Sequence, residues 1–344
     1  MIILFDRGYF MSDSENIILI DWFSFSSKVE DPAALIDSIG LSNFPFITTS
    51  GHYGYKSAKY YGGIWVLYDG REGMGTCLEM SGQGCRQYES SGDRKLEDLV
   101  NLVASLSCDY HITRLDVAFD DVDHEGSGLL NVQKIDALAR RDRYISKFKS
   151  KSGSWSAKHN DDGAPEKIAY SVYFGSSQSD VRFRIYDKSM ERGGLDYHWV
   201  RFEVQLRDEA CLNFITSPGT VGSKFSGVIN NYLRFIVPQK NDTNRRRWPS
   251  PEWWIKFLGS AEKISLYTAK DIEYNLTRLE RYLYKQCGNS ILTYIDCVGL
   301  PYFYQKIKDR EEYLNENQRK LVSEYKELEE KRLKEIWAKH PQGL

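Results

Sequence analysis

Apolar and polar residues alternate in short runs over most of the chain between residues 17 and 206. Such runs, separated by glycine, serine and aspartate clusters, are typical of half-buried antiparallel strands. Two stretches, 95–106 and 131–141, instead place leucine, isoleucine and valine at helical spacing. The mixture predicts an α+β fold, in which curved antiparallel sheet is backed by helices.

The alternation ends where prolines, polar residues and charges gather. Residues 238–252 have this composition, which predicts a linker or an exposed loop. We therefore predict an N-terminal extension over 1–16, a catalytic domain over 17–237 and a mainly helical C-terminal region over 253–344.

Residues 302–340 are highly charged and carry one regularly spaced apolar position in every seven. The residues at this position are Ile307, Leu314, Leu321 and Leu328. A coiled coil needs two apolar positions in each heptad. The spacing therefore predicts a single amphipathic helix that packs on the rest of the protein.

Four predicted strands carry polar side chains on one face, because residues two apart in a strand point to the same side. Their apolar residues, such as Leu115 and Phe183, point to the other side. The polar side chains are Glu79, Arg114, Asp116, Asp120, Arg184, Tyr186, Lys188, Arg201, Glu203 and Arg207. If the four strands share one sheet, its open face gathers carboxylates, guanidinium groups, a lysine and a phenol.

Such a face is suited to phosphate chemistry. Carboxylates bind Mg²⁺ or Mn²⁺, arginines bind phosphate oxygens in bidentate fashion, and a hydroxyl can attack phosphorus in line. A free phenol has a pKa of about 10, so a neighbouring cation is needed to favour the phenolate. An ordinary solvated sheet face with cross-strand ion pairs explains the same residues, and patterning alone favours that alternative.

Composition and charge do not identify a partner. The 344 residues carry a formal net charge of −2, so any contact with nucleic acid must come from local basic patches. The six cysteines include no CxxC pair, which indicates reduced thiols, and no apolar run approaches a membrane span. We expect a soluble cytoplasmic protein that makes no membrane contact.

Basic residues gather with aromatic residues at three places. Residues 139–158 hold the densest group, which comprises Arg140, Arg141, Arg143, Lys147, Lys149, Lys151 and Trp155. A flexible loop of this composition suits phosphate contacts and base stacking, and a solvated loop without a ligand is an equal alternative. A second patch contains Arg245, Arg246 and Arg247, and residues 52–61 form a third cluster with the same two interpretations.

Five segments together resemble one protein family. They are IDWFSF at 20–25, LEMSGQGCR at 78–86, TRLDVAFD at 113–120, FGS at 174–176 running into RIYDK at 184–188, and RFEVQLR at 201–207. In this order they resemble the Rep-trans replication initiation factors of rolling-circle plasmids, integrative conjugative elements and filamentous phages. The chain length and the opening Ile-Asp-Trp look most like the filamentous-phage branch.

The resemblance implies a function for Tyr186. In the family the matching tyrosine nicks one origin strand, stays joined to the 5′ phosphate and leaves a 3′ hydroxyl that primes rolling-circle synthesis; the strand is later rejoined. The resemblance also implies a requirement for Mg²⁺ or Mn²⁺, with Asp116 and Glu203 as the first candidates for metal ligands and then Glu79 and Asp120.

The same resemblance implies which side chains bind the DNA and which molecules are the partners. The side chains expected to hold the scissile phosphate or the phenolate are Arg184, Lys188, Arg201 and Arg207. The partners would be double-stranded origin DNA with a locally single-stranded nick site, and a host helicase and polymerase. Monomer and homodimer both stay open.

One departure concerns the histidines. Other nicking enzymes bind metal through a His-hydrophobic-His pair, and none of the six histidines here forms one. The metal would therefore be held by carboxylates. Two other functions stay open on the same fold: a conjugative relaxase of an integrative element, and an origin-binding protein without catalysis.

Overall fold

The computed structural model describes most of the chain in two compact units. The described residues are 14–42, 44–90, 94–106, 109–159, 165–192, 194–266 and 288–314, with a few further positions between 283 and 326. Unit 1 comprises Met1–Ser42, Phe46–Cys85 and Leu96–Tyr267, and unit 2 comprises Asn43–Pro45, Arg86–Lys95 and Thr268–Leu344. The predicted N-terminal extension falls almost entirely outside the described residues.

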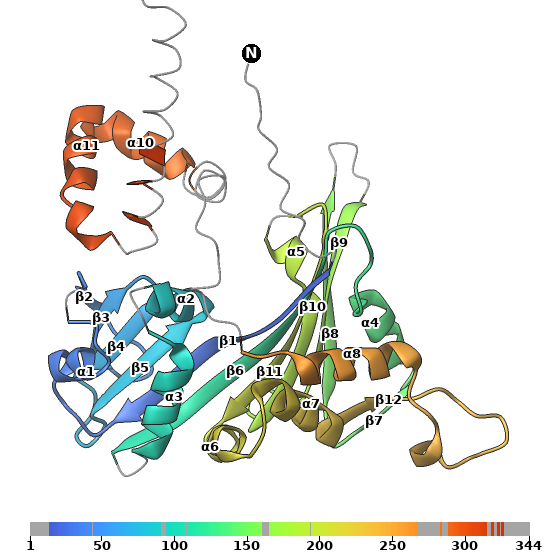
Figure 1. Ribbon diagram of the computed structural model, residues 1–344. Coiled ribbons are helices and arrows are strands. Elements are labelled where there is room, and N and C mark those ends of the chain that lie inside the picture. Colours follow the sequence, from blue (N-terminus) through green and yellow to red (C-terminus); the bar gives the residue numbers. More distant parts are fainter. Residues whose placement is uncertain are drawn as a thin grey trace, which may run out of the picture. The chain divides into compact units, whose positions relative to one another are not determined.

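Unit 1 is built on one antiparallel sheet (Figure 1). Its strands follow the order β2-β3-β4-β5-β1-β6-β11-β10-β9-β8. They are β1 (Ser14–Ser27), β2 (Ile47–Ser50), β3 (Ser57–Tyr61), β4 (Ile64–Tyr68), β5 (Thr76–Ser81), β6 (Tyr110–Asp123), β8 (Lys151–His159), β9 (Pro165–Phe174), β10 (Val181–Asp187) and β11 (His198–Arg207). The predicted α+β class, with antiparallel sheet backed by helices, is confirmed.

The four polar strands of the sequence pattern lie in this sheet, as β5, β6, β10 and β11, and β1 lies between β5 and β6. Cross-strand pairs place Tyr186 opposite Arg201 and Arg201 opposite Asp120. Arg184 lies opposite Glu203 in the next row on the same side. We call this side of the sheet the catalytic face, after the function that the sequence resemblance implies for Tyr186.

Helices cover the other face of the sheet. The helices that begin in unit 1 are α1 (Pro32–Ser38), α2 (Gly82–Ser90), α3 (Leu96–Ser105), α4 (Val132–Arg140), α5 (Lys188–Glu191), α6 (Glu209–Thr216), α7 (Val221–Tyr232) and α8 (Glu252–Lys263). Of these, α5 instead contacts the catalytic face, through Lys188 and Glu191. Helices α3 and α4 confirm the two helices predicted from spacing. The Asn131 side chain caps α4 by accepting a hydrogen bond from the Lys134 backbone N–H, and α3 buries its leucine and valine stripe.

Aromatic rings form the core between the sheet and these helices. The Phe119 ring lies 5.1 Å from that of Phe257, and the Phe202 ring lies 5.4 Å from the same ring, centroid to centroid. Trp254 and Phe225 complete the cluster and are fully buried. Each buried ring contributes about 1.5–3 kcal/mol, so this core fixes the strands that carry the catalytic face.

A β-bulge lies in β1. Ile20 pairs with Val117 and Trp22 with Asp116, so Asp21 is an extra residue in the ladder. The fully buried side chains of β1 accordingly change from an even position, Ile18, to the odd positions Phe23 and Phe25. The bulge turns Asp21 toward the catalytic face.

Two local predictions differ from the structure. Lys188 is the first residue of α5 instead of the last of a strand. The stretch 139–158 is not a flexible loop. It comprises the end of α4, the short strand β7 (Tyr144–Ser146), which pairs with β12 (Leu233–Phe235), and β8, because its backbone groups find ladder partners in β12 and β9.

The stretch 238–252 contains one short 3-10 helix, η1 (Arg245–Arg247), and leads directly into α8. Helix α8 packs on α7 within unit 1. The functional boundary at this stretch stays a prediction.

Unit 2 is helical where it is described, as expected for the C-terminal region. It holds α10 (Gly288–Val298), α11 (Leu300–Lys308) and the 3-10 helix η4 (Glu311–Tyr313). The helix predicted over 302–340 therefore begins slightly earlier and ends at Lys308; most of the rest lies outside the described residues. The Arg319 guanidinium donates to the carbonyl groups of Glu311, Glu312 and Leu314, which stabilises the turn. None of the helices in the described part is long and apolar enough to cross a membrane.

Candidate active site

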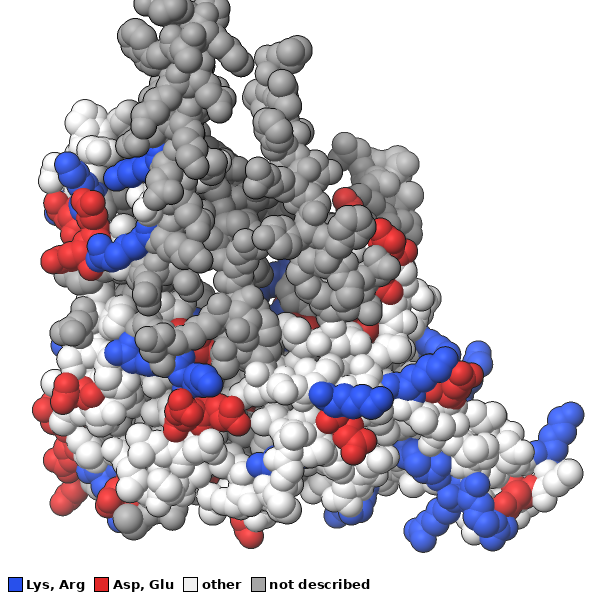
Figure 2. All heavy atoms as spheres, viewed as in Figure 1, with Lys and Arg blue, Asp and Glu red and all other residues white. Residues whose placement is uncertain are grey.

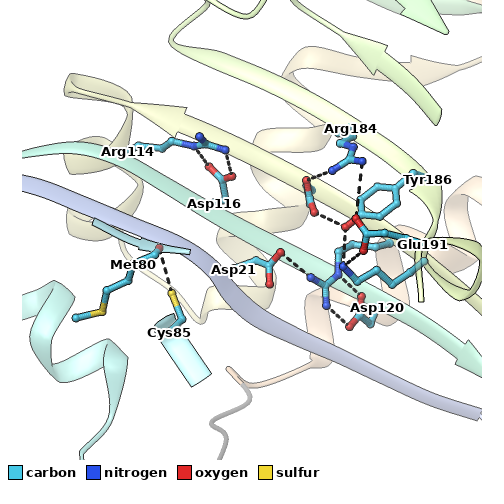
Figure 3. A network of polar contacts seen from close by, with 12 residues as sticks. Asp21, Met80, Cys85, Arg114, Asp116, Asp120, Arg184, Tyr186 and Glu191 are labelled. Atoms are coloured by element: carbon cyan, nitrogen blue, oxygen red, sulfur yellow. Dashed lines mark hydrogen bonds and ion pairs between the residues drawn. The ribbon is translucent and has the colours of Figure 1, made fainter. Parts of the chain in front are cut away.

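Tyr186 lies near the end of β10 with its hydroxyl group between two ionisable side chains (Figure 3). The hydroxyl donates a hydrogen bond to Glu203 Oε1 at 2.7 Å, and Lys188 Nζ donates to the hydroxyl at 3.2 Å. Lys188 reaches the hydroxyl from the first turn of α5, where its ammonium group also contacts Glu191. The phenol thus has a proton acceptor and a cation within hydrogen-bonding distance.

The surroundings shift the pKa values of all three groups. Burial and the neighbouring charge of Glu203 raise the pKa of Tyr186. Burial, followed by the negative charge of Asp21, raises the pKa of Glu203 to about 7. Burial and the positive charge of Arg201 lower the pKa of Lys188. A carboxylate that titrates near neutrality is suited to accept and return a proton at the phenol.

Arg184 lies directly over the tyrosine ring. Its guanidinium carbon is 3.8 Å from the ring centroid of Tyr186, and its Nη1 is 3.8 Å from Glu203 Oε2. In the described structure the Nε donor of Arg184 is buried without a partner, and so is that of Arg182 one row away on the same face. Unpaired guanidinium donors that face a phenol fit an anionic ligand.

Arg201 is held by two carboxylates. Its Nε and Nη2 donate to both oxygens of Asp120 at 2.6 Å each, and its Nη1 lies 2.6 Å from Asp21 Oδ2. The side chain is 5% exposed. These contacts engage all three guanidinium nitrogens, so Arg201 supplies fixed positive charge beside Tyr186.

Asp21 is a site residue that the sequence analysis quoted but did not assign. It reaches Arg201 because of the bulge in β1. The sequence gives only a weak signal of this bulge, because residues 17–20 are all apolar and alternate apolar residues appear only from Phe23 to Phe25. A clear change of phase in the alternation would indicate one extra residue in a strand.

A second row of charged groups lies farther along the catalytic face. Arg114 donates to both oxygens of Asp116, at 2.9 and 2.6 Å, and its guanidinium lies 4.2 Å from the Trp22 ring centroid. Glu79 Oε1 lies 3.5 Å from His52 Nε2. Burial raises the pKa of both Asp116 and Glu79. Arg207 lies opposite Arg114 in the ladder.

The acidic residues do not form a ready-made metal site. Their oxygen donors suit Mg²⁺ or Mn²⁺, but both oxygens of Asp116 and both of Asp120 are bound by guanidinium groups. No three Asp, Glu, His or Cys side chains in the described part of the chain are grouped so that they could hold a metal ion. The metal ligands named from the sequence stay a prediction.

The two main basic patches form one surface. The Arg245 guanidinium donates to the carbonyl groups of Asp142 and Tyr144, which joins the η1 loop to the turn after α4. Figure 2 shows lysine and arginine side chains gathered over this loop, at the lower right. We call this the basic surface, and its residues are Arg140, Arg141, Arg143, Lys147, Lys149, Lys151, Arg245, Arg246 and Arg247.

The basic surface does not lie on the catalytic face. In the ladder Tyr186 lies opposite Ser171, and Ser171 lies opposite Ser154, so these three residues share a side. Lys151 and Trp155, which alternate with Ser154 along β8, therefore point to the other side of the sheet. Lys151 Nζ donates there to the Ala139 carbonyl group at the end of α4, and Trp155 is 61% exposed. Several basic side chains already have partners: Arg140 contacts Asp136, Lys151 contacts Asp142, Lys147 contacts Asn231 and Arg247 contacts Asp242.

Comparisons with known proteins agree on one group of relatives. A family model described as "Replication initiation factor" matches residues 110–316, and one described as "Rolling Circle replication initiation protein N-terminal domain" matches residues 17–103. The chain is 26% identical over 272 residues to the "Putative DNA relaxase NicK" of Bacillus subtilis (strain 168), with 74% of each chain covered.

One solved structure also matches the chain. It is described as "Structure of Rolling Circle Replication Initiator Protein from Geobacillus stearothermophilus". The TM-score is 0.67 at 27% identity, and the match covers 74% of this chain and 99% of that one.

Proposed function

Because the chain belongs to the replication initiation factor family, we propose that it starts rolling-circle replication by nicking one strand of origin DNA through Tyr186. The observation that carries this proposal is the hydrogen bond from the Tyr186 hydroxyl to Glu203, with Arg184 above the ring. Origin DNA is the substrate. A host helicase would separate the strands, and a host polymerase would extend the 3′ end. The filamentous-phage branch stays a prediction.

Glu203 acts as the proton acceptor. It takes the Tyr186 hydroxyl proton, and the phenolate oxygen forms a bond to the scissile phosphorus while the bond from phosphorus to the 3′ oxygen breaks. The 3′ oxygen takes a proton from water and becomes the free primer. The 5′ phosphate stays on Tyr186, and the reverse sequence, with the proton returned from Glu203, rejoins the strand.

Arg184 holds the scissile phosphate, aided by Arg182 and Lys188. Arg184 and Arg182 have unpaired donors on the catalytic face, and Lys188 Nζ stabilises the phenolate that forms 3.2 Å away. Arg201 is a positioning residue, since Asp21 and Asp120 fix its charge beside the phenol. Arg207, farther along the face, would contact the DNA backbone on one side of the nick.

The family also implies Mg²⁺ or Mn²⁺. Such an ion, when bound, supplies positive charge that favours the transition state. The carboxylates of Asp116, Glu203, Glu79 and Asp120 remain the candidates for its ligands, and the steps above concern the protein's own side chains.

The Tyr186→Phe variant tests the nucleophile. Wild-type protein is incubated with a supercoiled plasmid that carries its gene and flanking DNA, with Mg²⁺, with Mn²⁺ or with EDTA. We expect open circles that carry protein on a 5′ end, and we expect Tyr186→Phe to form no covalent adduct because it lacks the attacking oxygen. Peptide mapping of the adduct identifies the residue and the polarity together.

Tyr170→Phe is the matched control. Tyr170 is the neighbour of Ser171 in β9 and points away from the catalytic face, so loss of its hydroxyl should leave the adduct yield unchanged. Full nicking by Tyr186→Phe, or a 3′ linkage, would contradict the proposal. Salt-sensitive binding with no adduct under any condition would instead favour an origin-binding protein without catalysis.

A second candidate function is a transfer relaxase of an integrative element. One observation favours it, namely that the Bacillus subtilis relative is described as a putative DNA relaxase. The nicking step is the same in both functions. Mating assays separate them: a relaxase raises the transfer frequency of a plasmid that carries the nick site, whereas a replication initiator supports maintenance of that plasmid without transfer.

A further inference from the structure

An aromatic cluster lies outside the candidate active site and has no role in the steps above. Its members are His52, Tyr53, Tyr60 and Trp65. The His52 ring centroid is 4.5 Å from that of Tyr53 and 5.3 Å from that of Trp65, and the Tyr60 and Trp65 centroids are 4.5 Å apart. None of the four rings is fully buried.

The aromatic cluster lies on the catalytic face. In the ladder Tyr60 lies opposite Trp65, and Trp65 lies opposite Glu79. Glu79 lies opposite Ser24 on the next strand, and Ser24 lies opposite Arg114. The rings therefore continue the row of charged groups across the same side of the sheet.

The loop that carries Tyr53 is closed by backbone hydrogen bonds, and it holds the ring in solvent. Tyr53 is 73% exposed and has a φ of 54°, a conformation that a non-glycine residue rarely adopts. The loop is closed by hydrogen bonds from the Gly51 N–H to the Lys56 carbonyl, at 3.0 Å, and from the Tyr55 N–H to the His52 carbonyl, at 3.1 Å. Packing does not explain a large ring that is held outward in a strained turn.

We propose that the aromatic cluster binds unpaired DNA bases by stacking, and so holds the single strand on the catalytic face. This inference rests on the proposed function, because it assigns the strand that Tyr186 cuts. Stacking on aromatic rings is the common way to hold unpaired bases, since every base has a π-face. The arginine and lysine side chains of the catalytic face bind phosphate, whereas the aromatic cluster offers the ring faces on which unpaired bases can stack.

Tyr53→Ala tests the inference without knowledge of the origin sequence. Fluorescence anisotropy measures the Kd for an oligothymidine of about 20 nucleotides and for an abasic oligonucleotide of equal length and charge. We expect Tyr53→Ala to raise the Kd for oligothymidine by about 5- to 100-fold, the loss that removal of one stacking ring causes. Affinity for the abasic strand should not change, and Tyr53→Trp should restore binding of oligothymidine.

Tyr304→Ala is the control, because Tyr304 is a ring of the same kind that is 62% exposed on α11 and is not a member of the aromatic cluster. An unchanged Kd for oligothymidine in Tyr53→Ala would overturn the inference, as would an equal loss for the abasic strand. Adduct formation at saturating DNA is measured separately. Its absence in the wild type would contradict the nicking proposal, while the two Kd values would still decide whether the cluster stacks bases.

Discussion

At the scale of single residues, the catalytic face depends on which charges neutralise one another. Arg201 is enclosed by Asp21 and Asp120, whereas Arg184 keeps an unpaired buried donor over the Tyr186 ring. Glu203 lies 2.7 Å from the phenol oxygen and is repelled by the charge of Asp21. Arg201 is therefore suited to provide a fixed positive charge, and Arg184 is suited to bind an anionic ligand.

The pH dependence of nicking tests the role of Glu203. Its pKa is raised to about 7, so the carboxyl group is protonated and cannot accept the phenol proton at lower pH. We expect the single-turnover rate of adduct formation to rise with pH through a midpoint near 7. In Glu203→Gln we expect a fall of about 10²–10⁴-fold, as for loss of a general base, and no such midpoint.

Glu209→Gln controls for the loss of a carboxyl group, because Glu209 is exposed at the start of α6.

Folding stability should fall as pH rises, opposite to the rate of adduct formation. The folded Glu203 holds its proton up to about pH 7, above the unfolded value of 4.5, so folding stability falls as pH rises between the two. Urea titrations at pH 5 and pH 8 measure this fall, and Glu203→Gln should remove it. If the rate of adduct formation depended on pH identically in wild type and Glu203→Gln, Glu203 would not be the proton acceptor.

At the scale of elements, the contact between α2 and the turn from β3 to β4 supports the strand that carries Glu79. Gly84, in the first turn of α2, approaches the backbone of Gly63 in that turn. A Cβ atom on Gly84 would lie 2.2 Å from the Gly63 carbonyl oxygen. Only a glycine fits this approach, because neither backbone can move without disturbing β4 and β5.

Gly84→Ala should therefore destabilise the protein. We expect a loss of about 1–3 kcal/mol in the free energy of unfolding, measured by urea denaturation, because the added methyl group forces backbone strain. Gly227→Ala is the control, since a Cβ at this position in α7 meets nothing within 4 Å. That variant should gain about 0.5–1 kcal/mol from helix propensity. Equal stability of the two variants would show that the close approach is absent.

At the scale of the whole molecule, the residues that we assign to DNA lie on two sides of one sheet. Tyr186 and the aromatic cluster are on the catalytic face, and the basic surface is on the side that α4 covers. The formal net charge of −2 makes this local concentration of lysine and arginine more significant for binding. We propose that the basic surface holds the duplex phosphates and the catalytic face holds the strand to be cut.

Arg246→Ala should weaken binding of duplex DNA. Arg246 is exposed and, within the described part of the chain, its guanidinium has no partner, so it can neutralise a phosphate. We expect the slope of log K against log salt to decrease by about 0.9, measured by anisotropy over a salt series. Arg247→Ala should have a smaller effect, because Asp242 already binds that guanidinium at 2.8 and 2.7 Å. A larger decrease in this slope for Arg247→Ala than for Arg246→Ala would contradict the proposal that Arg246 neutralises a phosphate.

Much of the fold was determined by the sequence alone. Alternation with a period of two is a local property, so it predicted the strands, their buried face and the common side of Tyr186, Glu203 and Asp116. The leucine and valine stripe predicted α3 for the same reason. Local patterns failed where backbone partners came from far along the chain, as in the pairing of β7 with β12, where the paired residues are 87 to 91 positions apart.

Only the tertiary structure decided which charges are paired and which face each patch occupies. The partners of Arg201 are Asp21 and Asp120, and these meet because β1, β6 and β11 are neighbours in the sheet. Strand order is set by packing of the aromatic core and by ladder pairing over long separations, and no short sequence pattern encodes it. The sequence could therefore propose Tyr186 and its acidic and basic neighbours, while their roles depend on the folded sheet.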